Sequence, residues 1–144
     1  MIKVLEICAA NMASAVAAQN SGADRIELCS ELAVGGVTPS YGVISAVRSA
    51  ISIAINVLVR PRSGDFLYTS DEAESVLRDI AACAQLGVQG VVVGALTPMA
   101  KVDEQMARDW LKEAHRKGLS ATFHRAIDCA DDIFEAPDAI ASIG

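Results

Sequence analysis

The feature that most constrains this chain is a regular alternation of short apolar segments with longer segments of helical spacing. Five segments rich in apolar and β-branched residues predict strands, at Val4–Cys8, Arg25–Cys29, Ala54–Arg60, Gly90–Val93 and Ser120–His124. Each is followed by a predicted helix, at Met12–Asn20, Ser40–Ala50, Ser70–Leu86, Asp103–Lys117 and Ile133–Ile143. This alternation predicts an α/β protein with a parallel sheet, open or closed.

Several residues mark where the helices begin. Thr69 and Glu72 have the spacing of a capping box, and Asp103 can cap the fourth helix. Pro39 suits the first turn of the second helix, behind Thr38. Three helices are also expected to end in a left-handed glycine, at Gly22, Gly87 and Gly118.

The strands differ on their two sides. Alternate strand residues point to opposite faces of a sheet, and in four of the five strands one face is apolar. The other face carries most of the polar and thiol side chains, namely Glu6, Cys8, Arg25, Glu27, Cys29, Asn56, Arg60, Ser120, Thr122 and His124. A doubly wound sheet is covered on both faces, whereas a barrel packs only its outer face against helices. The polar face therefore favours a TIM-type (β/α) barrel with a site at its mouth.

The length of the chain bears on how complete such a barrel would be. The chain has 144 residues, which suits one domain, but a complete barrel usually needs about 250 residues. It stops at Ile143-Gly144, where a sixth strand would begin. We expect residues 1–144 to form a single partial barrel domain, truncated after about five βα units. The alternative is a complete five-stranded doubly wound fold.

Charge and hydropathy exclude several classes of partner. The net charge is −6 and no run of Lys or Arg occurs, which argues against binding to nucleic acid or to an anionic membrane surface. No stretch of about 18 apolar residues is present, and Glu6 interrupts any signal-peptide core. We expect a cytoplasmic protein.

The cysteines suggest a metal site. None of the four forms a CxxC pair, and Cys8 and Cys29 occupy equivalent places in adjacent predicted strands. Strands lie about 4.8 Å apart, so the two sulfur atoms could approach one ion, and two soft thiolates suit Cu(I). The alternative is that both are small buried side chains. Cys83 is expected in the core and Cys129 in a loop near the mouth.

Three charged or titratable residues are candidates for catalysis. Glu27 and His124 could serve as acid and base, and Arg60 could hold a carboxylate or phosphate. The alternative is a structural ion-pair network, in which Glu6 or Glu27 would pair with Arg60.

Loops after the strands supply further candidates. Residues 35–40 contain Gly35-Gly36 and lead into a helix, and residues 60–65 follow the third strand. Neither loop is a P-loop. We expect the mouth to be lined as well by Glu6, Arg62, Asp65, Arg125 and Asp128.

Five stretches of the sequence, in order along nearly the whole chain, resemble the CutC family, called copper homeostasis proteins. They are Leu5–Cys8, Gly22–Cys29, Gly35–Gly42, Arg60–Tyr68 and Thr122–Asp128. The resemblance implies a TIM-type barrel and a cytosolic protein that handles copper, with Cys8 and Cys29 as Cu(I) ligands. Family members are longer than this chain.

Three functional hypotheses follow. The first is cytosolic Cu(I) binding of the CutC type. The second is a small-molecule enzyme that acts on a phosphate- or carboxylate-bearing substrate at the barrel mouth. The third is an inactive barrel fragment. The expected partners are a copper ion or a small anionic molecule, and association into a homo-oligomer is left open.

Overall fold

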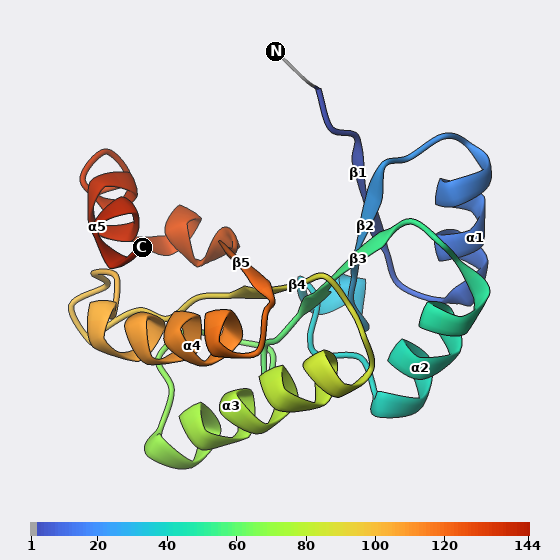
Figure 1. The fold of residues 1–144 in the computed structure, drawn as a ribbon. Helices are drawn as coiled ribbons and strands as arrows, with labels where there is room; N and C mark the ends of the chain where they lie inside the picture. Colours follow the sequence, from blue (N-terminus) through green and yellow to red (C-terminus); the bar gives the residue numbers. More distant parts are fainter. Residues whose placement is uncertain (1–2) are drawn as a thin grey trace.

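A computed structural model describes residues 3–144 and shows five strands alternating with five α-helices (Figure 1). The strands are β1 Glu6–Ala9, β2 Arg25–Leu28, β3 Ala54–Leu58, β4 Gly90–Val93 and β5 Ser120–Phe123. The helices are α1 Met12–Asn20, α2 Tyr41–Ala50, α3 Ser70–Gln85, α4 Glu104–Arg116 and α5 Ala136–Ile143. Two short 3-10 helices, η1 Leu32–Val34 and η2 Arg125–Cys129, follow β2 and β5. All ten predicted elements are present, and α1 and β4 have the predicted bounds.

The strands form one parallel sheet in the order β1-β2-β3-β4-β5. Helices α1 to α4 all lie on one side of this curved row of strands (Figure 1). A doubly wound sheet has helices on both faces and a reversal in strand order, so that alternative is wrong. The fold is a partial TIM-type (β/α) barrel.

The face toward the helices is the main hydrophobic core. It contains Ile26 and Leu28 of β2, Ile55 and Val57 of β3, and Val91 and Val93 of β4, all buried. The apolar face predicted from the sequence is thereby confirmed. The strand register also shows which residues of β4 face inward, a question that the sequence left open because β4 is apolar on both faces. Leu58 lies opposite Val92, and both belong with Cys29 to a small separate cluster on the inner face.

The two outermost strands each pair with one neighbour among the described residues, so the sheet is open. At the β1 edge, Leu5 and Ile7 stay 50% and 37% exposed. These side chains belong to the apolar face, which is therefore incompletely covered there.

The predicted helix ends are mostly confirmed. The Thr69 side chain accepts a hydrogen bond from the Glu72 amide at 3.2 Å, and the Glu72 carboxylate accepts one from the Thr69 amide at 2.8 Å. Asp103 caps α4, and the three predicted glycines have positive φ angles. Helix α2 begins one residue later than predicted, and its N-cap is Ser40, so Pro39 precedes the helix instead of lying in its first turn behind Thr38. The Thr38 hydroxyl is engaged elsewhere, with the backbone of Arg60.

Among residues 3–144, no helix combines the length and the apolar character needed to cross a membrane.

Candidate functional site at the barrel mouth

The sheet register arranges the inward side chains in tiers. The lowest tier that spans the sheet joins Cys8, Glu27, Asn56, Gly90 and Ser120. The next holds Cys29, Leu58 and Val92, and the last lies just beyond the strands, at Arg60, Gly94 and His124. Charged and thiol groups thus reach the interior at different heights.

Cys8 and Cys29 form the first cluster. Their sulfur atoms lie 3.7 Å apart, although the Cα register partner of Cys8 is Glu27 and not Cys29. The thiols therefore meet diagonally on one face, one tier apart. Cys8 is exposed and Cys29 is buried. Burial raises the pKa of Cys29 to about 12, with further contributions from the neighbouring Cys8 thiol and Glu27, so Cys29 is protonated at neutral pH.

Glu6 and Glu27 lie on the same side of the site as the thiols. Glu6 forms an ion pair with Arg25 and accepts a hydrogen bond from the Asn56 amide at 2.9 Å, at the lower end of β1 rather than at the mouth. No hydrogen bond or ion pair engages the side chain of Glu27 within residues 3–144. Burial and the charge of Glu6 raise the Glu27 pKa.

The predicted pairing of Glu6 or Glu27 with Arg60 is wrong. Glu27 lies opposite Asn56, which is four residues before Arg60 in the chain. At about 3.3 Å per residue, the two backbone positions are separated by about 13 Å along the strand.

Arg60 is held instead by backbone carbonyl groups. Its Nη1 donates to the carbonyls of Val34 and Gly36 at 3.1 and 2.8 Å, and its Nη2 donates to the carbonyl of Gly64 at 2.7 Å. The guanidinium carbon lies 4.7 Å from the centre of the Phe66 ring, a cation–π contact. Arg60 is only 4% exposed, and its Nε has no hydrogen-bond partner among the described residues.

Gly35 brings a second guanidinium group to Arg60. A Cβ atom built on Gly35 would lie 3.0 Å from Nη1 of Arg125 and 3.4 Å from Nη1 of Arg60. Gly35 also has a φ of +86°, a backbone angle that residues with a side chain rarely adopt. Thr38 anchors the same loop, since its hydroxyl accepts from the Arg60 amide at 2.9 Å and donates to the Arg60 carbonyl at 3.0 Å.

His124 is buried beside this pair, with 6% of its surface exposed. Its Nδ1 accepts a hydrogen bond from the Ala126 amide at 3.2 Å, so the neutral ring carries its proton on Nε2. Nε2 has no partner among the described residues. Burial, followed by the positive charges of Arg60 and Arg125, lowers the pKa of His124 to about 4. His124 is thus a neutral hydrogen-bond donor at pH 7.

Two neighbouring cavities open at the mouth. One, of about 330 Å³, is lined by Glu27, Leu58, His124 and Arg125 among others. The other, of about 400 Å³, is lined by Arg60, Phe66, Arg125 and Cys129 among others. Both cavities share Gly35 and Arg125. The structure therefore brings Glu27 and His124 to one cavity, as the hypothesis of an acid and a base requires.

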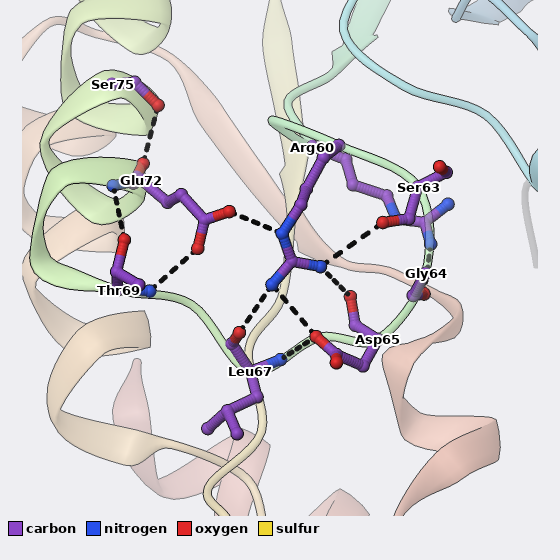
Figure 2. A network of polar contacts seen from close by, with 9 residues as sticks. Arg60, Ser63, Gly64, Asp65, Leu67, Thr69, Glu72 and Ser75 are labelled. Atoms are coloured by element: carbon purple, nitrogen blue, oxygen red, sulfur yellow. Dashed lines mark hydrogen bonds and ion pairs between the residues drawn. The ribbon is translucent and has the colours of Figure 1, made fainter.

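The structure does not bring Arg62, Asp65 or Asp128 to these cavities. The Arg62 guanidinium binds Glu72 and Asp65 and donates to the carbonyl of Leu67 at 2.7 Å. Figure 2 labels these three partners within a wider network of polar contacts. Arg62 thereby holds the loop between β3 and α3. Asp128 is exposed in η2 and lines neither cavity.

Two residues that shape the site were missed from the sequence. Gly94 makes room for His124, because a Cβ atom there would lie 2.6 Å from Nδ1 of the ring. Phe66 supports the Arg60 guanidinium. A glycine directly after the Val91–Val93 run was the available signal for Gly94, and the place of Phe66 within the Arg60–Tyr68 stretch was the signal for Phe66.

The comparison with known proteins agrees with this architecture. A family model described as the CutC family matches residues 3–144. The chain belongs to the CutC family. A CutC family protein of Chromobacterium violaceum is 43% identical over 144 residues, and one of Porphyromonas gingivalis is 44% identical over 144 residues. All of this chain is covered, and it spans 58% and 57% of the length of these relatives.

A solved CutC structure extends this agreement to the fold. The protein of Streptococcus agalactiae, provisionally named copper homeostasis protein CutC, has a TM-score of 0.89 and 32% identity. The match covers 99% of this chain and 70% of that one. The βα units described here therefore correspond to those of a CutC protein, and the chain represents part of the length of its relatives.

Proposed function

We propose that this chain binds Cu(I) through Cys8 and Cys29, as part of copper handling in the cytosol. The observation that carries the proposal is the distance of 3.7 Å between the two sulfur atoms. The membership in a family associated with copper homeostasis points to the same metal. All four cysteines are free thiols, in keeping with a reducing compartment.

The geometry suits a soft ion with few ligands. Metal–sulfur bonds are about 2.3 Å long, so two sulfurs on opposite sides of an ion would be about 4.6 Å apart. A small rotation of the exposed Cys8 side chain would supply this separation from the observed 3.7 Å. Within residues 3–144, no group of three or more His, Cys, Asp or Glu side chains could hold a metal ion. The pair therefore favours Cu(I), which accepts soft thiolates, over a tetrahedral zinc site.

The surroundings also favour a cation. Glu27 is the register partner of Cys8 and has no cationic partner within the described residues. Burial raises the pKa values of Glu27 and Cys29, and a bound positive ion would lower them again by stabilising the deprotonated forms.

The proposal is tested by titrating the purified chain with Cu(I) against a competing chromogenic chelator. We expect one Cu(I) per chain. Loss of a ligand in Cys8→Ser should weaken binding by more than the roughly 10–100-fold that loss of an outer-shell group costs. Cys8 is exposed, so this variant should fold, and circular dichroism checks that it does.

Cys129→Ser is the matched control, because Cys129 is also an exposed thiol but lines the cavity beside Arg60. It should bind Cu(I) like the wild-type chain. Unchanged affinity in both Cys8→Ser and Cys29→Ser would refute the proposal.

A further inference from the structure

The other side of the mouth carries two arginines, Arg60 and Arg125, that form no ion pair within residues 3–144. Arg60 is almost fully buried, yet within the described residues the hydrogen bonds of its guanidinium go only to the carbonyls of Val34, Gly36 and Gly64. Arg125 places a second guanidinium nitrogen beside Gly35, next to that of Arg60. A buried charge is costly unless it is paired, and carbonyl dipoles replace a counter-ion only in part.

Glu27, the acidic residue of the adjoining cavity, does not supply the missing charge. Glu27 lines the adjoining cavity together with Arg125 and His124. Within residues 3–144, however, the Glu27 carboxylate forms no ion pair with Arg60 or Arg125. Burial, followed by the positive charges of Arg60 and Arg125, lowers the pKa of His124 on the same side of the mouth.

Arg60, His124 and Arg125 all present N–H donors on this side of the mouth. Arg60 has five N–H groups, of which three are used by carbonyls, and its buried Nε is among those left over. His124 adds a buried Nε2–H without a partner, and Arg125 adds an exposed guanidinium. A ligand that satisfies these groups must bring acceptors and negative charge, which is the chemistry of an oxyanion.

We propose that the barrel mouth binds a small molecule by its carboxylate or phosphate group, which is held between Arg60 and Arg125 beside Gly35. The cavity of about 400 Å³ suits a small metabolite, and Phe66 provides an apolar wall for the rest of the molecule. Gly35 is required because a side chain there would occupy the space in which the two guanidinium groups converge. The proposal is independent of copper, since neither Cys8 nor Cys29 lines this cavity.

The test is a titration of the purified chain with inorganic phosphate and, separately, with malonate, each against chloride at equal ionic strength. The readout is the NMR signal of the histidine ring protons, because the chain has two histidines. His115 is exposed on α4 and serves as the internal reference, and His115→Gln assigns the two signals. We expect His124 to shift in a saturable manner while His115 does not.

Arg125→Gln is the decisive variant, because Arg125 is exposed and its loss should not prevent folding. Removal of one charged hydrogen-bond donor should weaken binding roughly tenfold or more. Arg78→Gln is the matched control, since Arg78 is 79% exposed on α3 and lies outside both cavities. It should bind like the wild-type chain.

Each outcome is informative. Binding of phosphate alone or malonate alone identifies the preferred oxyanion, and binding of either supports the proposal if Arg125→Gln weakens it. No saturable shift of His124 with either anion, or equal binding by Arg125→Gln, overturns it. The Cys8→Ser variant should bind the anion normally, so that failure of the copper proposal and failure of this one are separable.

Discussion

The two halves of the barrel mouth differ in chemistry although one sheet builds both. The half on β1 and β2 presents two thiols 3.7 Å apart and the unpaired carboxylate of Glu27. The half beyond β3 and β5 presents Arg60, Arg125 and a neutral His124. The first half offers electron pairs to a cation, and the second offers only donors to an anion.

The difference shows how register separates opposite charges that the sequence would pair. Glu27 and Arg60 are both inward-facing, but the register puts Asn56 beside Glu27 and carries Arg60 beyond the end of β3. Neither group is neutralised by the other. Each is therefore available for a ligand of its own.

The largest expected effect concerns the pH dependence of folding stability on the basic side. The His124 pKa is about 4 in the folded chain and about 6.5 when unfolded. The unfolded chain therefore binds more protons in this range, so stability is complete above about pH 6.5 and falls as the pH drops toward 4. The difference corresponds to about 3 kcal/mol in the free energy of unfolding.

Urea unfolding at several pH values between 7.5 and 4 measures this effect. His124→Gln should show a shallower loss of stability over this range, while His115→Gln, at an exposed position, should follow the wild-type chain. An identical pH dependence for wild type and His124→Gln would mean that His124 does not titrate as described.

A smaller effect should follow from Gly94→Ala, which disturbs the basic half alone. The added Cβ would lie 2.6 Å from Nδ1 and 2.7 Å from Cε1 of His124, so the ring must move. Overpacking of this kind costs about 1–3 kcal/mol of stability. We expect weaker phosphate binding with unchanged Cu(I) affinity, measured by the two titrations.

Gly42→Ala is the control, because a Cβ there meets nothing closer than 3.9 Å and alanine favours the helix. It should be neutral or stabilising. If Gly94→Ala weakened Cu(I) binding as much as phosphate binding, the two halves would not be independent.

The smallest effect is expected for Arg62→Gln. Arg62 is partly exposed and clamps the loop before α3 through Glu72 and Asp65, outside both cavities. Exposed ion pairs contribute little, so we expect the melting temperature to fall by about 2–5 °C. Differential scanning calorimetry measures this fall. Phosphate and Cu(I) affinities should not change, and a loss of phosphate binding would extend the basic half to this loop.

Much of the fold could be predicted because it rests on local patterns. The apolar runs predicted the strands, and Thr69 with Glu72 predicted the start of α3. Alternation predicted which strand residues face inward, and this held for Asn56 and Leu58. The candidate site was predicted less well. The sequence indicated that Cys8 and Cys29 would approach each other, but it wrongly predicted an ion pair between Arg60 and a glutamate.

The sequence by itself determined the βα alternation, the inner face and the residue types that reach it, because side-chain period and helix capping depend on neighbours in the chain. Only the tertiary structure decided which inward groups meet. The register between strands set the heights of Glu27, Cys29 and Arg60, and the loop at Gly35 brought Arg125 to Arg60. Such pairings depend on backbone positions in separate strands and loops, whose relative offset no local pattern encodes.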